Sequence, residues 1–517
     1  MKALIRCDEA RALDASIASS WALPEGALME SAALGLWLAL AKILGTDLAR
    51  TEERIVVVAG SGNNGGDALA LARHAAFAGC RQLTAIVPSA ELRALVACQA
   101  ASLAAGGIPL LRAGSPEAQQ AIAQATLIVD GIAGTGLTGS LRGEARELVS
   151  AINAARAPVL SIDLPSGFRD AAGPDDPVIE ADWTLSIVPT KKCLYLPAFR
   201  PRSGSIIEIE DVFPAEAGNT SLARLLDPSE YLHSSSGSVD SHKGQRGRVG
   251  VLAGSPGMAG AALLAVRAAQ AAGAGLVTLY TCPELFASLG AGQAGEALGG
   301  AIVKLESSLR DDRSRLDSVL AGPGWVPAEG QAALLSWLLE SGLPLVLDAG
   351  ALAAASLAAA GEAASLLRAR QGKHAPLILT PHPGELSALS GIAIPELLAD
   401  PEPTLRAACE RFDATIILKS STSWMRSPAG EIRVLDGREP GLGVAGSGDV
   451  LSGLTAGLLA RDAAGRTQFL QSTGLDIMTR AACLHLLAGR QARAELGWFD
   501  AFSLIPALSR LSGSPQA

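Results

Sequence analysis

The sequence predicts two α/β domains within one chain of 517 residues. Short apolar runs rich in β-branched residues alternate with alanine- and leucine-rich helical stretches along the whole chain. This alternation is typical of parallel sheets covered by helices on both faces, with ligands bound beyond the carboxyl ends of the strands. A chain of this length is too long for one hydrophobic core, so two domains of ordinary size are expected.

The expected strands fall into two groups separated by a polar, turn-forming stretch near residues 214–240. In the first half, glycine, proline or aspartate lies at or next to the end of each run, as is typical of strands that lead into turns. The apolar stretch 260–280 is interrupted by Arg267 and Gln270, so it predicts a buried helix and a strand and not a membrane span. The expected strands lie in 55–60, 83–88, 127–132 and 158–167, then in 249–255, 276–281, 344–350, 376–385 and 415–421.

Composition excludes several classes of function. The chain is 49% hydrophobic and 18% charged, which is typical of a globular protein, and its net charge of −9 gives no basic surface for nucleic acid. Charged residues interrupt the first 16 positions, where a secretory signal needs an apolar core. The seven cysteines form no CxxC pair and lie near no histidine cluster. We therefore expect a cytoplasmic protein with reduced thiols and no membrane partner.

Three strand ends in the first half carry acids, hydroxyls and glycines. The first strand leads into SGNNGGD, the third ends at Asp130 before GIAGTGLTGSLRG, and the fourth ends at Asp163 before LPSG. Carboxylate and amide oxygens suit a hard cation, and glycine-rich turns let backbone N–H groups approach a pyrophosphate. The alternative for SGNNGGD alone is a polar helix cap with Asp67 in its first turn.

The second half contains GLGVAGSGDVLSGLTAGLL at 441–459, a glycine-rich turn that places Asp449 at the start of an apolar helix. Backbone N–H groups and the helix dipole favour a phosphate there. A carboxylate beside a phosphate is repelled unless it has a role, and the usual role is to take a proton from an attacking hydroxyl. The alternative is that Asp449 only occupies the first turn of a helix.

The first half resembles the NAD(P)H-hydrate epimerase, or YjeF N-terminal, domain through GSGNNGGD, VDGIAGTGLTG, DLPSG and the helix LMESAALGLWLAL. The resemblance implies a Rossmann-like three-layer sandwich over residues 1–216. It implies potassium ligands at Asn64, Asp130 and Ser166, and makes Asp163 the first candidate for the acid-base residue. The residues implied to line the hydrated nucleotide are Asn63, Asn64, Gly65, Gly66, Asp67, Gly134, Thr135, Gly136, Leu137, Thr138, Gly139, Ser140 and Asp163.

The second half resembles the ribokinase-like NAD(P)H-hydrate dehydratase family, or YjeF C-terminal family, through HKGQRG, GSPGMAGAA, GAGLVT, GPG, LDAGAL, TPHPGE, LKSSTS and GSGDVLSG. It implies a ribokinase-like α/β domain over residues 225–512. The implied adenine-nucleotide contacts are Lys419, Ser420, Ser421, Thr422, Ser423 and Gly448. The implied contacts with the hydrated dinucleotide are Ala261, Gly324, His382 and Asp449.

Together the resemblances imply a bifunctional repair enzyme, an isomerase joined to a lyase, that epimerises R and S hydrates of NADH or NADPH and dehydrates the S form. ADP with Mg²⁺, or ATP, is the implied co-substrate, and a homo-oligomer is implied by the family alone. Asp449 is expected to deprotonate the C6 hydroxyl, which then attacks the terminal phosphoryl group. Two alternatives stay open: a small-alcohol kinase of the ribokinase type with a regulatory first half, or a nucleotide-binding sensor whose sites have degenerated, as Ala68, Ser420 and Glu439 suggest.

Overall fold

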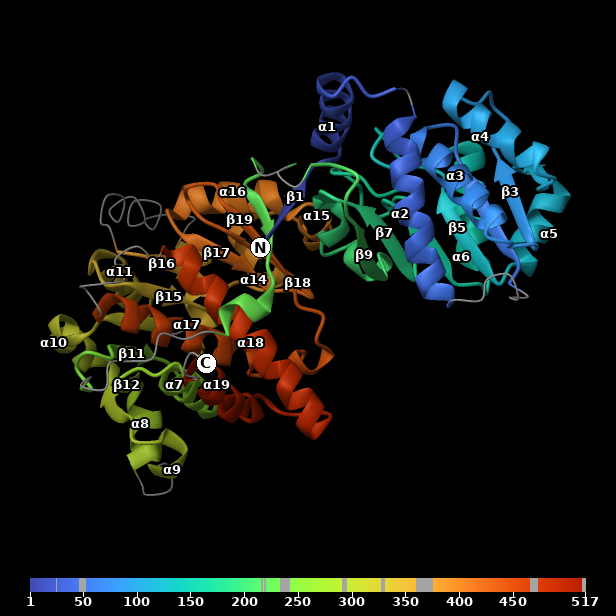
Figure 1. The fold of residues 1–517 in the computed structure, drawn as a ribbon. Coiled ribbons are helices and arrows are strands. Elements are labelled where there is room, and N and C mark those ends of the chain that lie inside the picture. Colours follow the sequence, from blue (N-terminus) through green and yellow to red (C-terminus); the bar gives the residue numbers. More distant parts are fainter. Residues whose placement is uncertain are drawn as a thin grey trace. The chain divides into compact units, whose positions relative to one another are not determined.

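The computed structural model confirms the predicted α/β class and divides the chain into two compact units (Figure 1). The structure describes residues 1–24, 26–45, 53–214, 217, 220–232, 242–290, 295–326, 331–358, 375–464 and 473–513. The N-terminal unit comprises 3–223 with 398–400, and the C-terminal unit comprises 1–2, 224–397 and 401–517. The polar stretch 233–241 near the expected boundary lies outside the described residues.

The N-terminal unit is built on seven parallel strands in the order β4-β3-β2-β5-β6-β7-β9. These are β2 (Ile55–Ala59), β3 (Leu83–Val87), β4 (Leu110–Arg112), β5 (Leu127–Gly131), β6 (Val159–Ile162), β7 (Trp183–Ile187) and β9 (Ser205–Ile209). Outside these seven strands, β1 (Lys2–Ile5) pairs in parallel with β8 (Thr190–Lys191). The helices are α1 (Cys7–Ser20), α2 (Ala27–Leu44), α3 (Asn63–Phe77), α4 (Ala94–Ala105), α5 (Pro116–Gln124) and α6 (Gly143–Ala154).

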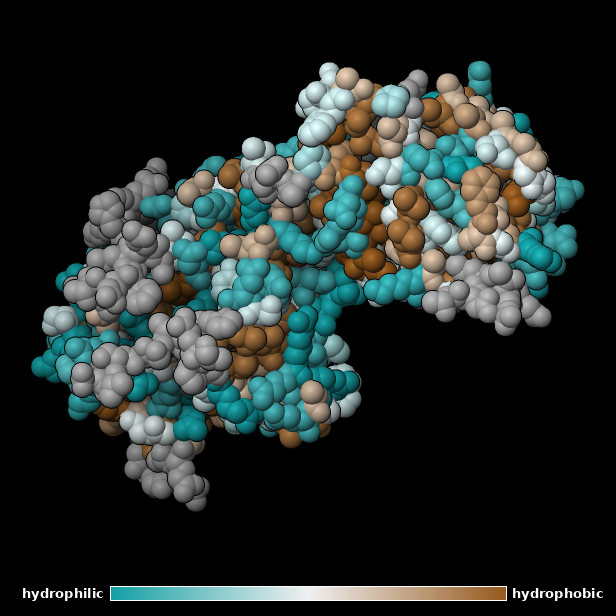
Figure 2. All heavy atoms as spheres, viewed as in Figure 1, coloured by the Kyte–Doolittle hydropathy of each residue, from teal (hydrophilic) through white to brown (hydrophobic). Residues whose placement is uncertain are grey.

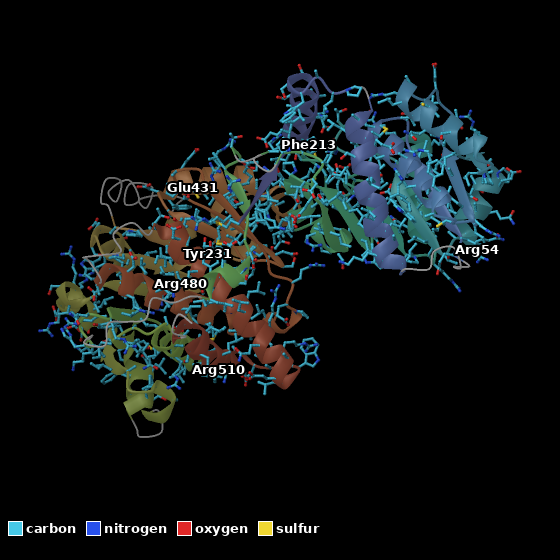
Figure 3. The ribbon with its side chains drawn as sticks, viewed as in Figure 1. Arg54, Phe213, Tyr231, Glu431, Arg480 and Arg510 are labelled. Carbon is cyan, nitrogen blue, oxygen red and sulfur yellow. The ribbon has the colours of Figure 1, made fainter. Side chains whose placement is uncertain are left out.

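Both faces of this sheet are covered, which makes three layers. Along β2, Ile55 and Val57 belong to a core shared with α2, α3 and α4, whereas Val56 and Val58 belong to a second core shared with α5 and α6. Every residue of β2 is buried, as expected for a strand between two helical layers. Arg54, labelled in Figure 3, precedes β2 and marks the amino ends of the parallel strands. The predicted site residues lie at the opposite edge of the sheet, after the carboxyl ends of the strands.

Helix α2 contains the one segment among the described residues that is long and apolar enough to cross a membrane. Only 28% of its 18-residue window is buried, and Leu34 and Leu38 are exposed on it. Hydrophobic residues, drawn in brown, reach the surface in this part of the molecule (Figure 2). Ala32, Leu36 and Leu40, however, belong to the core beneath the helix. Core helices of soluble proteins pass the same test of length and composition, so this helix is weak support for a membrane span.

The C-terminal unit has a mixed sheet in the order β13-β12-β11-β14-β15-β16-β17-β18-β19, parallel up to β17 and antiparallel beyond it. Its strands are β10 (Ala223–Leu225), β11 (Arg248–Leu252), β12 (Leu276–Thr281), β13 (Ile302–Leu305), β14 (Ser318–Ala321), β15 (Leu345–Leu347), β16 (Leu377–Leu379), β17 (Thr415–Leu418), β18 (Thr422–Arg426) and β19 (Ile432–Asp436). Its helices are α7 (Ala259–Ala271), α8 (Pro283–Gly290), α9 (Gly295–Leu298), α10 (Leu309–Asp312), α11 (Gln331–Glu340), α12 (Ala349–Ala358), α14 (Pro383–Ser390), α15 (Ile394–Ala399), α16 (Pro401–Phe412), α17 (Ser447–Ala464), α18 (Gly474–Leu496) and α19 (Leu504–Gly513).

Glycines allow α17 to lie against α7 at very short range. A Cβ on Gly453 would lie 2.3 Å from the carbonyl oxygen of Ala265, and one on Gly457 would lie 2.6 Å from the Cβ of Ala272. Both distances are too short for non-bonded carbon and oxygen atoms, so larger residues would force the helices apart. Helix α17 is therefore held against α7 by close contacts at Gly453 and Gly457.

Candidate functional site

The N-terminal site lies where the strand order reverses, between β2 and β5, which is the usual ligand crevice of an open α/β sheet. Asp130, on β5, is completely buried. Its carboxylate accepts hydrogen bonds from the hydroxyls of Ser161 and Ser166 at 2.8 and 2.5 Å, and from the backbone N–H groups of Ser166 and Ile132. Burial raises the pKa of this carboxyl group, and the hydrogen bonds oppose the rise.

Two other predicted potassium ligands lie around Asp130. Ser166 is fully buried, and its hydroxyl also accepts a hydrogen bond from the backbone N–H of Ala133 at 2.9 Å. Asn64 is 9% exposed, and its amide Nδ2 has no hydrogen-bond partner among the described residues. A Cβ on Gly134 would lie 3.0 Å from Asn64 Oδ1, so the asparagine contacts the loop that follows β5.

Asp163 is held by a buried lysine that the sequence analysis missed. The Nζ of Lys191 lies 2.6 Å from Asp163 Oδ1 and 2.8 Å from the carbonyl oxygen of Ile187, and the lysine and aspartate side chains are 5% and 10% exposed. The backbone N–H of Ile187 donates to the same carboxylate oxygen at 3.1 Å. Asp163 has a φ of +61°, a left-handed conformation that is rare outside glycine and asparagine and is common at functional sites.

Asp67 adds a second carboxyl group to this site. Burial raises its pKa well above the usual value, and the negative charges of Asp163 and Asp14 raise it further, against the opposing effect of Lys191. Asp14, on α1, likewise has its pKa raised to about 6, first by burial. Four ionisable side chains from α1, α3 and the ends of β6 and β8 therefore act on one another at this edge of the sheet.

The predicted glycines of the N-terminal site have different roles. A Cβ on Gly65 would lie 2.0 Å from the carbonyl oxygen of Gly60, and one on Gly66 would lie 2.4 Å from Met29 Cε, so both are required for packing of α3. In the loop after β5, Gly136, Thr138 and Gly139 are exposed and Gly134, Thr135, Leu137 and Ser140 are half-buried. That loop, together with Asn63, contains the exposed residues of the predicted set.

The C-terminal site is centred on a lysine and an aspartate that follow β17 and β15, the two strands on either side of β16. Lys419 follows β17, and its Nζ lies 2.8 Å from Oδ1 of Asp348, which follows β15 and is 2% exposed. A Cβ on Gly448 would lie 3.3 Å from the same Nζ, so the ammonium group stands beside the first turn of α17. Asp348 lies in the LDAGAL motif, but the sequence analysis did not select it as a site residue.

Asp449, in that first turn, is partly buried and has its pKa raised to about 6. Burial is the main cause, the negative charges of Asp348 and Glu385 add to it, and Lys419 opposes it. The turn before α17 needs its glycine, because Gly446 has a φ of +91° and a Cβ there would lie 2.4 Å from Leu264 Cδ1. A carboxyl group that titrates near neutral pH is suited to accept a proton.

His382 caps α14 and has a defined tautomer. Its Nδ1 accepts hydrogen bonds from the backbone N–H groups of Gly384 and Glu385 at 3.0 and 3.3 Å, and Glu385 accepts from the backbone N–H of His382. An accepting Nδ1 leaves the proton of the neutral ring on Nε2. Nε2 lies 3.5 Å from Oε1 of Glu385, and the side chain is 57% exposed, so a ligand can reach this edge of the ring.

A cavity of about 730 Å³ adjoins Lys419 and the start of α17. Its apolar wall is formed by Ile417, Leu435, Leu442, Val444, Leu451 and Leu486. The predicted residues that line it are His382, Lys419, Ser420, Ser421, Ser423 and Gly448. Thr422 is fully buried in β18 and is absent from the described lining, as are Asp449, Ala261 and Gly324.

Ala261 and Gly324 lie next to each other at another part of the same sheet edge. A Cβ on Gly324 would lie 3.1 Å from the Cβ of Ala261, and Gly324 has a φ of +66°. They follow β11 and β14, between which the strand order reverses. The predicted contacts with the dinucleotide are thus split between this reversal point, the end of β16 at His382 and the first turn of α17 at Asp449.

The cavity also contains residues that the motifs did not reveal. His485, from α18, lies 3.2 Å from the hydroxyl of Ser447, and burial lowers its pKa to about 4, so the ring is neutral at physiological pH. Glu439 lines the cavity, but its Oε1 accepts a hydrogen bond from the backbone N–H of Gly441 at 3.0 Å. Glu439 therefore serves as the cap of a short helical turn.

Two family models match the chain. Residues 25–193 match the YjeF-related protein N-terminus, and residues 249–509 match NAD(P)H-hydrate dehydratase. The chain is 31% identical to the bifunctional NAD(P)H-hydrate repair enzyme of Coxiella burnetii, over 80% of this chain and 83% of that one. It is also 31% identical to the corresponding enzyme of Moorella thermoacetica, over 88% of this chain and 87% of that one.

A solved structure is also similar to the C-terminal unit. It is the ADP/ATP-dependent NAD(P)H-hydrate dehydratase of Bacillus subtilis, co-crystallised with ATP and Mg²⁺. It is 23% identical, covers 55% of this chain and 96% of its own length, and has a TM-score of 0.45.

Proposed function

The chain belongs to the family of bifunctional NAD(P)H-hydrate repair enzymes, and from that membership we propose how its two units divide the work. The N-terminal unit, residues 1–216, epimerises the R and S hydrates of NADH or NADPH. The C-terminal unit, residues 225–512, dehydrates the S hydrate at the expense of ADP. An epimerase that supplies the isomer accepted by the dehydratase explains why both units share one chain.

For epimerisation we propose Asp163 as the base and Asp67 as the acid. The ammonium of Lys191 lies 2.6 Å from Asp163 Oδ1 and holds that side chain in place. Burial and the Asp163 charge raise the pKa of Asp67, which favours its protonated form. Two carboxyl groups in such different environments can take and give the proton needed to open and close the ring, or to release and return the hydroxyl.

We propose Asn64, Asp130 and Ser166 as the potassium site. The fit rests on Asp130, a fully buried carboxylate whose hydrogen-bond donors among the described residues are hydroxyls and backbone amides, without a cationic side chain. A buried charge of this kind is stabilised by a cation, and oxygen donors are the ligands that hard cations prefer. Potassium would supply positive charge beside the phosphates of the substrate.

For dehydration we propose Asp449 as the base that takes the proton of the C6 hydroxyl. The hydroxyl oxygen then forms a bond to the terminal phosphorus of the nucleotide, and the bond from phosphorus to the bridging oxygen breaks. Phosphate is a far better leaving group than hydroxide, so the lone pair of the ring nitrogen expels it as inorganic phosphate and leaves an iminium ion. Loss of a proton from C5 to solvent then restores the dihydropyridine. His382 is positioned to donate its Nε2–H to the dinucleotide.

The nucleotide is proposed to occupy the cavity beside Lys419. The apolar wall suits an adenine ring, whereas Lys419, Arg438 and the hydroxyls of Ser420, Ser421 and Ser423 suit ribose and phosphate oxygens. The N-terminus of α17 adds backbone donors at Gly448. Mg²⁺ bound with the nucleotide would neutralise phosphate charge, and the oxygen atoms of Asp348 and Asp449 are of the type that this ion prefers. Use of ADP or ATP as the co-substrate, a cytoplasmic location and a homo-oligomeric state are parts of the same proposal.

The observation that carries the proposed function is Asp449, with a pKa near 6, beside Lys419 at the start of α17. The test incubates the full chain with mixed R and S hydrates and ADP or ATP, and follows the absorbance of the reduced nicotinamide. Full recovery is expected. Recovery of only half would contradict the epimerase activity, no recovery would contradict the dehydratase activity, and a stable phosphorylated alcohol would instead identify a kinase.

A further inference from the structure

Two cysteines and an aspartate form a cluster in the N-terminal unit. Cys7 begins α1, and Cys193 lies in a short 3-10 helix that follows β8. Their sulfur atoms are 3.7 Å apart, and both side chains are buried. Asp170 completes the group, since one ligand atom from each of the three residues lies within 4.8 Å of the others.

The separation of the two sulfurs matches a shared metal ion. Zn²⁺ binds thiolate sulfur at about 2.3 Å in a tetrahedral arrangement, which places two sulfur ligands about 3.8 Å apart. The observed 3.7 Å agrees with this separation. A disulfide would need the sulfurs to approach to about 2.05 Å, so the present geometry favours a metal over a covalent bond.

Asp170 supplies a free oxygen to the cluster. Its Oδ2 accepts a hydrogen bond from the backbone N–H of Cys7 at 2.8 Å. Its Oδ1 is buried and has no hydrogen-bond partner among the described residues. A buried carboxylate oxygen without a partner is unfavourable, and coordination of a cation would satisfy it. The hydrogen bond at Oδ2 meanwhile fixes the orientation of the group.

The surrounding charges suit an occupied site. Two thiolates and a carboxylate around one Zn²⁺ leave a net charge of −1. Arg6 lies at the edge of the cluster, with Nη2 4.0 Å from Asp170 Oδ2, and Lys192 immediately precedes Cys193. These two cations offset the residual charge. Soft thiolate ligands select Zn²⁺ over Mg²⁺ or K⁺, so the cluster is chemically distinct from the oxygen-lined site at Asp130.

We propose that Cys7, Cys193 and Asp170 bind one Zn²⁺, with a water molecule as the fourth ligand. Each thiol gives up its proton to solvent on binding, so two protons are released per ion. The ion would join the start of α1 to the segment after β8, two residues beyond Lys191. An effect on epimerisation rests on the proposed function, whereas binding of the ion does not.

The test is metal binding by the full chain, prepared reduced and metal-free. Titration with Co²⁺ is expected to give a thiolate-to-cobalt charge-transfer band that saturates at one equivalent and disappears when Zn²⁺ is added. Cys7→Ser, Cys193→Ser and Asp170→Asn should each weaken binding about tenfold or more. Cys98→Ser removes an exposed thiol of the same unit and should leave binding unchanged.

A second measurement uses the wild-type chain and so does not depend on the folding of any variant. X-ray absorption at the zinc edge should show two sulfur ligands near 2.3 Å and oxygen ligands near 2.0 Å. A zinc environment without sulfur would overturn the proposal. So would a charge-transfer band that survives Cys7→Ser, or a chain two mass units lighter in which Cys7 and Cys193 are joined by a disulfide and bind no metal.

Discussion

Lys419 donates a hydrogen bond to the buried carboxylate of Asp348 at 2.8 Å, although the two residues are 71 positions apart in the sequence. The pair joins the ends of β15 and β17 next to the first turn of α17. It therefore fixes the lysine beside the proposed phosphate site and places a buried negative charge near Asp449. That charge is one of the reasons why the pKa of Asp449 is raised.

Asp348→Asn should lower the pKa of Asp449, because it removes a neighbouring negative charge and leaves Lys419 unneutralised. As a base, Asp449 must be ionised, so the dehydration rate of the wild type should rise with pH through about 6. In the variant, the midpoint of this pH profile of kcat should move to lower pH. The matched control is Asp311→Asn, an exposed acid on α10, which should leave the midpoint in place. An unchanged midpoint in Asp348→Asn would contradict the assigned coupling.

Asp449→Asn should abolish dehydration and leave nucleotide binding nearly intact. Loss of a general base costs about 10²–10⁴-fold in rate, whereas the side chain is absent from the described lining of the cavity. Single-turnover kinetics and calorimetric titration with ADP measure the two properties separately. Retained turnover would show that another group is the base.

The same variant should be more stable than the wild type above pH 6. The pKa of Asp449 is raised from 3.8 to about 6, so the folded state favours the protonated form. The stability associated with that form is complete below pH 3.8 and is lost as the pH rises through 6. Asparagine does not ionise and escapes this loss, which is on the order of 2 kcal/mol. Thermal unfolding at pH 5 and pH 8 checks the sign, and equal shifts at both values would refute it.

Asp130→Ala should impair epimerisation and leave dehydration unchanged, because Asp130 belongs to the N-terminal unit alone. If Asp130 helps to bind potassium, K⁺ should raise the melting temperature of the wild type more than Na⁺ does, and the variant should lose the difference. Asp175→Asn, an exposed acid of the same unit, serves as the control. Equal loss in both assays would contradict independent sites.

Lys191→Met should slow epimerisation, because Asp163 would lose the cation that holds its carboxylate in place. Breaking a buried ion pair can also destabilise the fold by about 3–5 kcal/mol, so Lys191→Arg is the second variant. It keeps the charge and should recover part of kcat. Lys42→Met, on the exposed side of α2, should change neither kcat nor KM. If Lys191→Met folded and kept full activity, the ion pair would be structural only.

The α/β class was predictable because each strand is a short apolar run followed by a turn. Such a local pattern can be recognised in the sequence itself. Asp130 and Asp163 could be found for the same reason, since they end strands whose carboxyl ends meet at one sheet edge. Lys191 gave no such signal. It lies in a two-residue strand, and only the folded chain shows that its ammonium group reaches back to Asp163.

The spacing of the cysteines likewise did not predict that two of them lie in contact. The sequence contains no CxxC pair, and Cys7 and Cys193 are 186 positions apart, yet their sulfurs are in contact. The roles of Gly65 and Gly66 were also hidden, because close approach to a ligand and close approach to another part of the backbone both require a residue without a Cβ. Such long-range contacts depend on the packing of whole elements, which local patterns do not specify.

The glycines that bring α17 against α7 lie four and eight residues after Asp449, about one and two turns further along the same side of the helix. A single added methyl group at Gly453, far from any reacting atom, would push α17 away from α7 and so displace Asp449. Substitution of either glycine by a larger residue is thus expected to abolish dehydration, although every proposed catalytic and binding side chain is still present.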